Sequence, residues 1–140
     1  LLYANGASRF GHAEGVRWLR LAADQGLADA QYNLGVAYDN GEGVPLDDAE
    51  AVRWYRLAAE QGHAMAQSNL GVMYATGEGV PQDLMQAHLW LNLAASRMTG
   101  EDREQAATNR DIAARMLTPA ALNEAQRLAR KWDATHPREP

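Results

Sequence analysis

Four histidines are the side chains of this sequence best suited to general-base catalysis or metal binding. They are His12, His63, His88 and His136. None lies in an H-E-x-x-H pattern, and the sequence has neither a G-x-S-x-G nucleophile motif nor a cysteine. A lone histidine without an ordering partner is usually structural or solvated. We therefore predict no catalytic residue and no enzymatic activity.

Two glycine-rich loops with acidic neighbours are the next candidates, for phosphate or cation binding. Residues 41–43 and 77–79 both read G-E-G, but they lack the lysine and the strand-to-helix setting of a phosphate loop. The nearby acidic residues do not have the alternating ligand spacing of a calcium loop. Helix capping already accounts for Asp47 and Asp83. The sequence therefore predicts no metal and no cofactor.

Composition limits the classes of partner. The 140 residues are 46% hydrophobic and 22% charged, which is typical of one soluble folded unit. A formal net charge of −5 disfavours nucleic acid, because phosphate neutralisation needs a basic excess. No apolar run approaches the ~20 residues of a transmembrane helix. The absence of cysteine suits both reducing and oxidising compartments, so the cytoplasm, the bacterial periplasm and secretion all stay open.

The sequence contains an internal repeat of 36 residues, which indicates how the chain is organised. Residues 30–38 (AQYNLGVAY) return as residues 66–74 (AQSNLGVMY), and residues 41–45 (GEGVP) return as residues 77–81. Trp18, Trp54 and Trp90 keep the same spacing. A fixed period of this length is the signature of a solenoid, in which each unit buries its apolar face against its neighbours.

Each unit reads as two helices. Ala30, Leu34, Ala37 and Tyr38 form one apolar stripe at helical spacing, and Gly41 follows as a left-handed C-cap. The second helix of each unit begins at about residues 48 and 84, directly after an aspartate that can cap it. Its apolar stripe includes the tryptophans, which we predict to be core residues. The fold class is therefore all-α, an α/α solenoid of stacked antiparallel helix hairpins.

Glycine also stands inside the first helix of both complete units, at Gly35 and Gly71. Glycine in a helix interior costs roughly 1 kcal/mol relative to alanine. We therefore expect another helix to pack closely against each of these positions.

The repeat pattern is A-Q-x-x-L-G-x-x-Y-x-x-G-x-G-V-P-x-D followed by A-x-x-W-x-x-x-A-A-x-x-G. It resembles the Sel1-like repeat family, within the tetratricopeptide-like superfamily of helical repeats. The resemblance implies one solenoid over residues 1–132. Its units are a partial repeat at 1–28, complete repeats at 29–64 and 65–97, and a divergent C-terminal capping helix pair at 98–132.

The two ends match the pattern less well. In the first unit we expect the tail of a helix at residues 1–4, a loop at residues 7–11, and a helix from Gly15 to Gly26. In the last unit we expect helices over residues 101–117 and 118–132, with Thr118 as N-cap, and a loose tail over residues 133–140. An incomplete first unit would leave an exposed apolar face, which predicts further repeats upstream or self-association through that end.

The predicted partner-binding surface is the side of the first helices that faces away from the hairpin stripe. Its members repeat in position but vary in type between units, as expected of a surface that reads a partner. They are Asp29, Tyr32, Val36, Asp39, Asn40, Met65, Ser68, Val72, Ala75 and Thr76. The alternative is that Tyr32 and Val36 fill the seam between neighbouring units, because solenoid helices commonly bury two faces.

The family resemblance implies a non-catalytic scaffold or adaptor, of bacterial origin, that holds a protein or peptide segment in its concave groove. Two alternatives stay open. One is binding of a glycan or peptidoglycan fragment, which requires more exposed aromatic residues than Tyr32. The other is β-lactam hydrolysis, as linked to cysteine-rich relatives of this repeat, although the cysteines and a nucleophile with its base are missing here.

Overall fold

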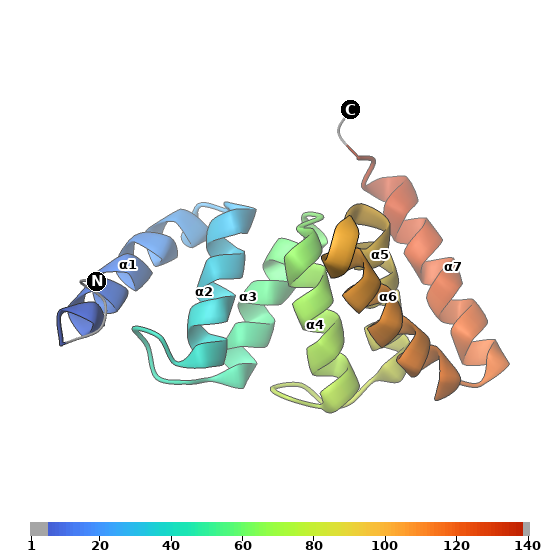
Figure 1. Ribbon diagram of the computed structural model, residues 1–140. Helices are drawn as coiled ribbons and strands as arrows, with labels where there is room; N and C mark the ends of the chain where they lie inside the picture. Colours follow the sequence, from blue (N-terminus) through green and yellow to red (C-terminus); the bar gives the residue numbers. More distant parts are fainter. Residues whose placement is uncertain (1–5, 139–140) are drawn as a thin grey trace.

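The computed structural model describes residues 6–138, with side chains from residue 13 onward. This part of the chain is all-α and contains seven helices and no strand (Figure 1). Their bounds are α1 Gly6–Asp24, α2 Ala28–Asn40, α3 Asp48–Glu60, α4 Ala64–Thr76, α5 Leu84–Arg97, α6 Gly100–Arg115 and α7 Pro119–Thr135. Within the same range, none of the helices combines the length and the apolar character that a membrane crossing needs.

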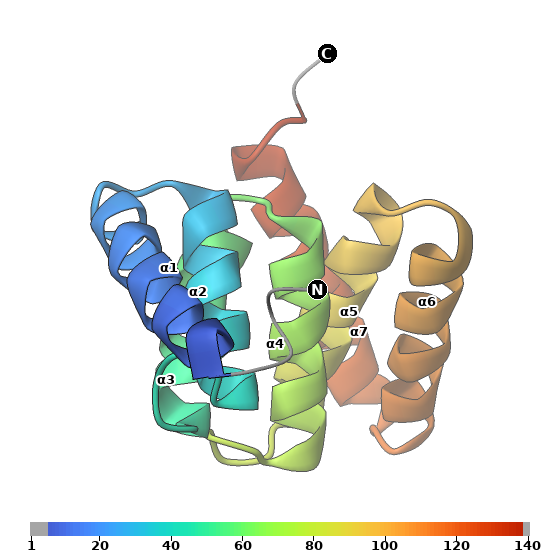
Figure 2. The ribbon, with the colours of Figure 1, turned by 60° about the vertical axis from the view of Figure 1, so that its left-hand side comes forward.

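Two helix hairpins, α2/α3 and α4/α5, stack side by side and confirm the predicted solenoid (Figures 1 and 2). One apolar cluster joins α1 to the first hairpin and includes Val16, Leu34 and Trp54. A second cluster joins the first hairpin to the next one and includes Tyr55 and Leu70. Each hairpin is therefore held by its neighbours as much as by its own two helices, as in other helical repeats.

The predicted helix ends are confirmed. Gly41 and Gly77 close the first helix of each hairpin in the left-handed conformation, with φ of 68° and 76°. Asp47 caps α3, because its Oδ1 accepts a hydrogen bond of 3.1 Å from the amide of the residue three positions later. Asp83 caps α5 with the same geometry. The acidic residues at these two positions thus serve helix initiation.

Gly35 and Gly71 allow the close helix packing that the sequence predicted. A Cβ added at Gly35 would lie 2.6 Å from Cδ1 of Tyr55, and one added at Gly71 would lie 2.7 Å from Cγ of Leu91. Both distances are far below the ~3.5–4.0 Å of an ordinary carbon contact. Because glycine has no side chain, the two helices of each hairpin can approach closely at these positions.

The tryptophans are not all core residues. Trp54 and Trp90 are buried, at 3% and 7% exposure, but Trp18 is 65% exposed and Leu21 beside it is 55% exposed. Trp54 is covered by α1 and α2. No described helix occupies the corresponding place beside α1, so the prediction of a buried Trp18 is wrong for this part of the chain.

The C-terminal helices do not pair as a hairpin. α6 and α7 both pack on α5, and they use different faces of it. Ala106 and Ala113 of α6 contact one face of α5. Ala129 of α7 joins the core cluster on another face, beside Trp90. The C-terminal segment thus forms two helices that both pack on α5.

Two predicted boundaries are also wrong. α1 is already helical at Gly6, through the residues 7–11 where a loop was expected. α7 continues to Thr135, and its end is held by an ion pair of 2.9 Å between Arg97 and Asp133. His136 stacks on Trp132 with ring centroids 3.9 Å apart, so this part of the expected loose tail is ordered. The expected helix tail at residues 1–4 lies outside the described residues.

Candidate functional site

The predicted binding residues lie on α2 and α4, the first helices of the two complete hairpins, and we call this surface the A-helix face. Five of them are exposed, and five are half-buried. The exposed residues are Asp29, Asn40, Met65, Val72 and Thr76, and the half-buried ones are Tyr32, Val36, Asp39, Ser68 and Ala75. The A-helix face is thus partly surface and partly seam.

Tyr32 belongs to a polar and aromatic cluster at the N-terminal end of α4. Its ring stacks on that of His63, with centroids 4.7 Å apart. Nδ1 of His63 accepts the Ala66 amide at 3.2 Å, so the proton of the neutral ring sits on Nε2, which lies 3.0 Å from Oδ1 of Asp29. His63 therefore caps α4 and ties two predicted binding residues together. This capping role was not predicted from the sequence, although the position of His63 directly before α4 is a capping position.

Val36 and Asp39 have seam contacts. Val36 packs against the core cluster between the two hairpins. Asp39 Oδ2 accepts a hydrogen bond of 3.1 Å from the Tyr55 hydroxyl. Burial and then the nearby Asp39 carboxylate raise the pKa of Tyr55 far above its usual value, so this hydroxyl stays protonated as the donor. The seam alternative therefore describes part of what Tyr32 and Val36 do, and Asp39 makes a seam contact as well.

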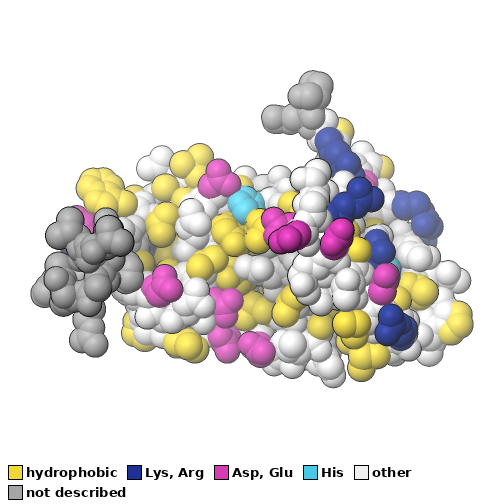
Figure 3. All heavy atoms as spheres, in the orientation of Figure 1, with side chains coloured by type: hydrophobic (Ala, Val, Ile, Leu, Met, Phe, Trp, Pro, Cys, Tyr) yellow, Lys and Arg dark blue, Asp and Glu magenta, His cyan; other side chains and the backbone are white. Residues whose placement is uncertain are grey.

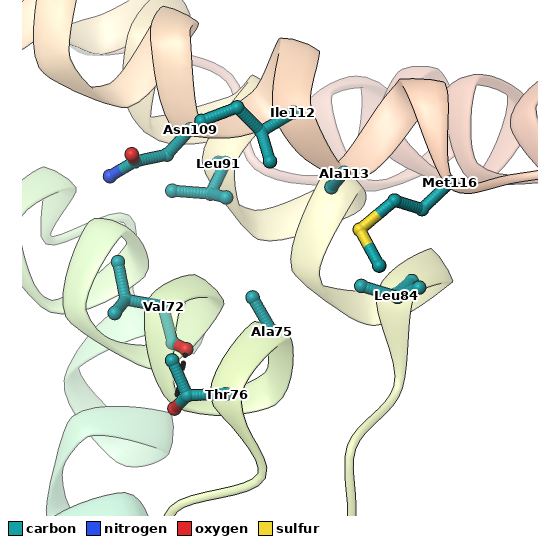
Figure 4. A pocket seen from close by; sticks show the side chains of 9 residues that line it. All are labelled: Val72, Ala75, Thr76, Leu84, Leu91, Asn109, Ile112, Ala113 and Met116. Atoms are coloured by element: carbon teal, nitrogen blue, oxygen red, sulfur yellow. Dashed lines mark hydrogen bonds between the residues drawn. The ribbon is translucent and has the colours of Figure 1, made fainter.

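An apolar pocket opens beside the second half of the A-helix face (Figure 4). It lies between α4, α5 and α6 and encloses about 250 Å³. Its lining residues are Val72, Ala75, Thr76, Leu84, Leu91, Asn109, Ile112, Ala113 and Met116. Three of them belong to the predicted surface. The α6 residues were missed, because the capping segment lacks the repeat signature that would have placed them.

Other polar residues of the repeat signature bind neighbouring helices. Nε2 of Gln31 donates to the Ala23 carbonyl at 3.2 Å, and Nε2 of Gln67 donates to the Ala59 carbonyl at 3.1 Å. Both glutamines are buried, and each one fastens the start of a hairpin to the end of the preceding helix. Their conserved spacing within the chain therefore reflects assembly of the solenoid.

In the described part of the chain, no three His, Cys, Asp or Glu side chains gather where they could hold a metal ion. His88 is buried, and its Nδ1 has no hydrogen-bond partner. Burial, and then the positive charge of Arg110, lower the pKa of His88, which favours the neutral ring. The side chain of His12 lies outside the described residues.

The surface of the two complete hairpins is acidic. Residues 28–97 contain nine acidic residues against three arginines, namely Arg53 and Arg56 on α3 and Arg97 at the end of α5. Arg53 pairs with Glu50, and Arg56 donates to the Tyr74 hydroxyl. Figure 3 shows acidic side chains over the α2–α4 part, whereas the basic side chains of this view gather over the C-terminal helices and tail. α2 and α4 themselves contain two aspartates and no lysine or arginine, and the cations that reach them are Arg20 at Tyr38 and Arg56 at Tyr74.

Stacked antiparallel hairpins with a 36-residue period define a helical-repeat solenoid. The Sel1 repeat model matches the chain at residues 1–27, 28–63 and 64–97. The chain therefore belongs to the Sel1 repeat family. Proteins with this fold are commonly protein-interaction scaffolds and are generally non-catalytic.

Two solved structures are similar to this chain. One is c5321, a protective antigen present in uropathogenic Escherichia coli strains that displays an SLR fold, with 37% identity and a TM-score of 0.81 over 89% of this chain. The other is a Sel1 repeat protein from Oxalobacter formigenes, with 36% identity and a TM-score of 0.64 over 69% of this chain. The matches span 26% and 37% of those two chains. A search of curated proteins gives no match.

Proposed function

We propose that this protein is a scaffold that holds an extended or helical segment of a partner protein against its A-helix face. The proposal rests on a difference between the packing residues, which are the same in both units, and the A-helix face, which varies. Packing residues such as Leu34 and Leu70 are identical between the units, whereas the face changes from Tyr32 to Ser68 and from Asp39 to Ala75. A helical-repeat array whose packing residues stay the same while one surface varies is suited to recognition of a specific segment.

The exposed apolar side chains of this face support the proposal. Met65 and Val72 are each 37% exposed, and they stand two turns apart on α4. Apolar residues that line a hollow are typical of protein docking surfaces. Contact with a partner would remove both side chains from water.

A peptide selection tests the proposal. The purified chain is used to select binders from a random display library, and the affinities of the selected peptides are then measured on two double variants. Met65→Asn with Val72→Asn removes apolar contacts on the face without adding charge. Leu46→Asn with Leu57→Asn makes the same change at exposed leucines elsewhere, where the exposures are 64% and 38%. We expect the first pair to weaken binding by about tenfold or more and the second to leave it unchanged. Equal effects of both pairs would refute the assignment of the face.

Self-association is a second interaction that we propose, through α1. Trp18 and Leu21 are both exposed there, whereas Trp54, the equivalent of Trp18 one repeat later, is buried. Light scattering over a concentration series should show a larger species that Trp18→Glu returns to the monomer. A strictly monomeric parent chain at all concentrations would refute this second interaction.

A further inference from the structure

Two equivalent seams can be compared: in the first seam the α2/α3 hairpin meets α4, and in the second seam the α4/α5 hairpin meets α6. They differ at three equivalent positions. In the first seam, the Tyr55 ring lies 5.9 Å from the Tyr32 ring and its hydroxyl reaches Asp39. The Tyr55 ring fills the space above Gly35. The residues 36 positions later are Ser68, Ala75 and Leu91.

All three replacements remove bulk or polarity, and two of the replacing residues, Ala75 and Leu91, line the pocket. Leu91 is fully buried and ends against Gly71, so it lacks the outer half of a tyrosine ring and the hydroxyl. Ala75 has no carboxylate for such a hydroxyl to meet. The pocket of about 250 Å³ lies at this point. It is smaller than the ~300–1,000 Å³ usual for small-molecule sites, and its size favours a single inserted side chain.

The pocket wall accepts apolar groups. The Thr76 hydroxyl already donates to the Val72 carbonyl at 3.1 Å, and Asn109 Oδ1 already accepts from Gln105 at 3.3 Å. Figure 4 shows the Asn109 amide at the rim on the Val72 side and the Met116 thioether at the opposite side. Ile112 and Met116 are 48% and 60% exposed, which is a large apolar exposure around one hollow.

Charged residues near the pocket indicate which residues of a partner can adjoin a side chain inserted into it. α2 and α4 contain no lysine or arginine, and the exposed Glu42 and Glu78 lie in the loops that follow these two helices. Arg110 and Arg115 lie on α6, at the opposite wall of the pocket. Positive charges on a partner would therefore be attracted to the α2–α4 side of the pocket.

We propose that this pocket receives one bulky apolar side chain, such as leucine or phenylalanine, from a partner segment whose adjoining residues are lysine or arginine and lie over α2 and α4. The inference rests on the proposed scaffold function and specifies its partner. A basic segment with one apolar anchor satisfies both the apolar wall and the acidic surroundings.

Three labelled peptides of equal length test the chemistry by fluorescence anisotropy. The first contains one leucine followed by lysines, the second replaces the leucine with alanine, and the third replaces the lysines with glutamates. We expect the first to bind at least about tenfold more tightly than the second, and to weaken as salt is raised. The third should show no binding. Equal affinity of the leucine and alanine peptides would overturn the proposal.

Two variants test the pocket itself. Leu91→Tyr with Ala75→Asp restores the residues of the first seam, and Ala75→Phe fills the pocket by a single change if the double variant does not fold. Ala120→Phe adds the same side chain at an exposed alanine of α7. The double variant adds negative charge, so a loss of affinity for the basic peptide there would come from pocket closure and not from charge.

We expect about tenfold weaker binding of the leucine peptide in both pocket variants and no change in Ala120→Phe. Unchanged binding of the leucine peptide by Ala75→Phe would refute the proposal that the pocket receives the leucine side chain. The scaffold function would still be supported if binding of the display-selected peptides depends on Met65. Failure of every peptide to bind the A-helix face would instead refute the scaffold function. A dimer of the parent chain that Ala75→Phe dissociates would assign the pocket to a second copy and overturn the basic partner.

Discussion

Replacing Gly71 with alanine should destabilise this protein, although alanine is the better helix former. The helix propensity of alanine favours the variant by roughly 1 kcal/mol. The new Cβ, however, would lie 2.7 Å from Leu91 Cγ and 3.2 Å from the backbone oxygen of Ala87. A backbone oxygen moves only with its helix, so α4 and α5 must separate. Overpacking of this kind costs about 1–3 kcal/mol, and we expect the upper end because it also loosens the hairpin.

The net loss should therefore be about 1–2 kcal/mol, which lowers the Tm by about 3–6 °C for a chain of this size. Urea unfolding followed by circular dichroism measures the free energy change directly. Gly15→Ala is the matched control, because Gly15 lies inside α1 and an added Cβ there meets nothing within 4 Å. It should stabilise the chain by about 0.5–1 kcal/mol. Equal shifts of the same sign in both variants would refute close packing as the reason for Gly71.

The remaining predictions concern the core, the helix caps and pH. Trp54→Ala should cost about 3–5 kcal/mol in urea unfolding, whereas Trp18→Ala, at a 65% exposed position, should stay within about 1 kcal/mol. Asp83→Ala should lose about 1 kcal/mol through the missing α5 cap, and Asp83→Asn should recover most of it. The pKa of His88 is lowered below 6.5 by burial, so the unfolded chain takes up a proton that the folded chain does not, and stability should fall as the pH drops below about 6.5. His88→Val, which copies Val52 of the preceding unit, should flatten that pH dependence; an unchanged dependence would show that other groups cause it.

The repeated parts of the fold could be predicted from the sequence because each of their positions has a local physical reason. An aspartate directly before an amphipathic stretch predicts a cap, and the structure has one at Asp47 and at Asp83. Glycine inside a helix predicts a close neighbour, and the structure has one at Gly35 and at Gly71. These inferences need only a few residues of sequence and the geometry of a helix.

The ends of the array could not be predicted in the same way, because burial there depends on which helix lies next to it. Trp18 has the spacing of a core residue and is exposed, since its burial would require another helix beside α1. Thr118 and Pro119 correctly predicted where α7 begins. They carry no information on the helix against which α7 packs, which is α5.

The candidate site shows why an internal repeat is more informative than either copy alone. Tyr55 read by itself is a buried aromatic residue, and Leu91 read by itself is a buried aliphatic one. Their equivalence, together with the paired difference between Asp39 and Ala75, reveals a hydroxyl and its acceptor that are present in the first seam and absent from the second. A change selected only for packing needs to preserve volume, since cavities cost stability. The second seam instead leaves its volume unfilled and lines it with exposed apolar side chains, as expected where a partner supplies the missing group.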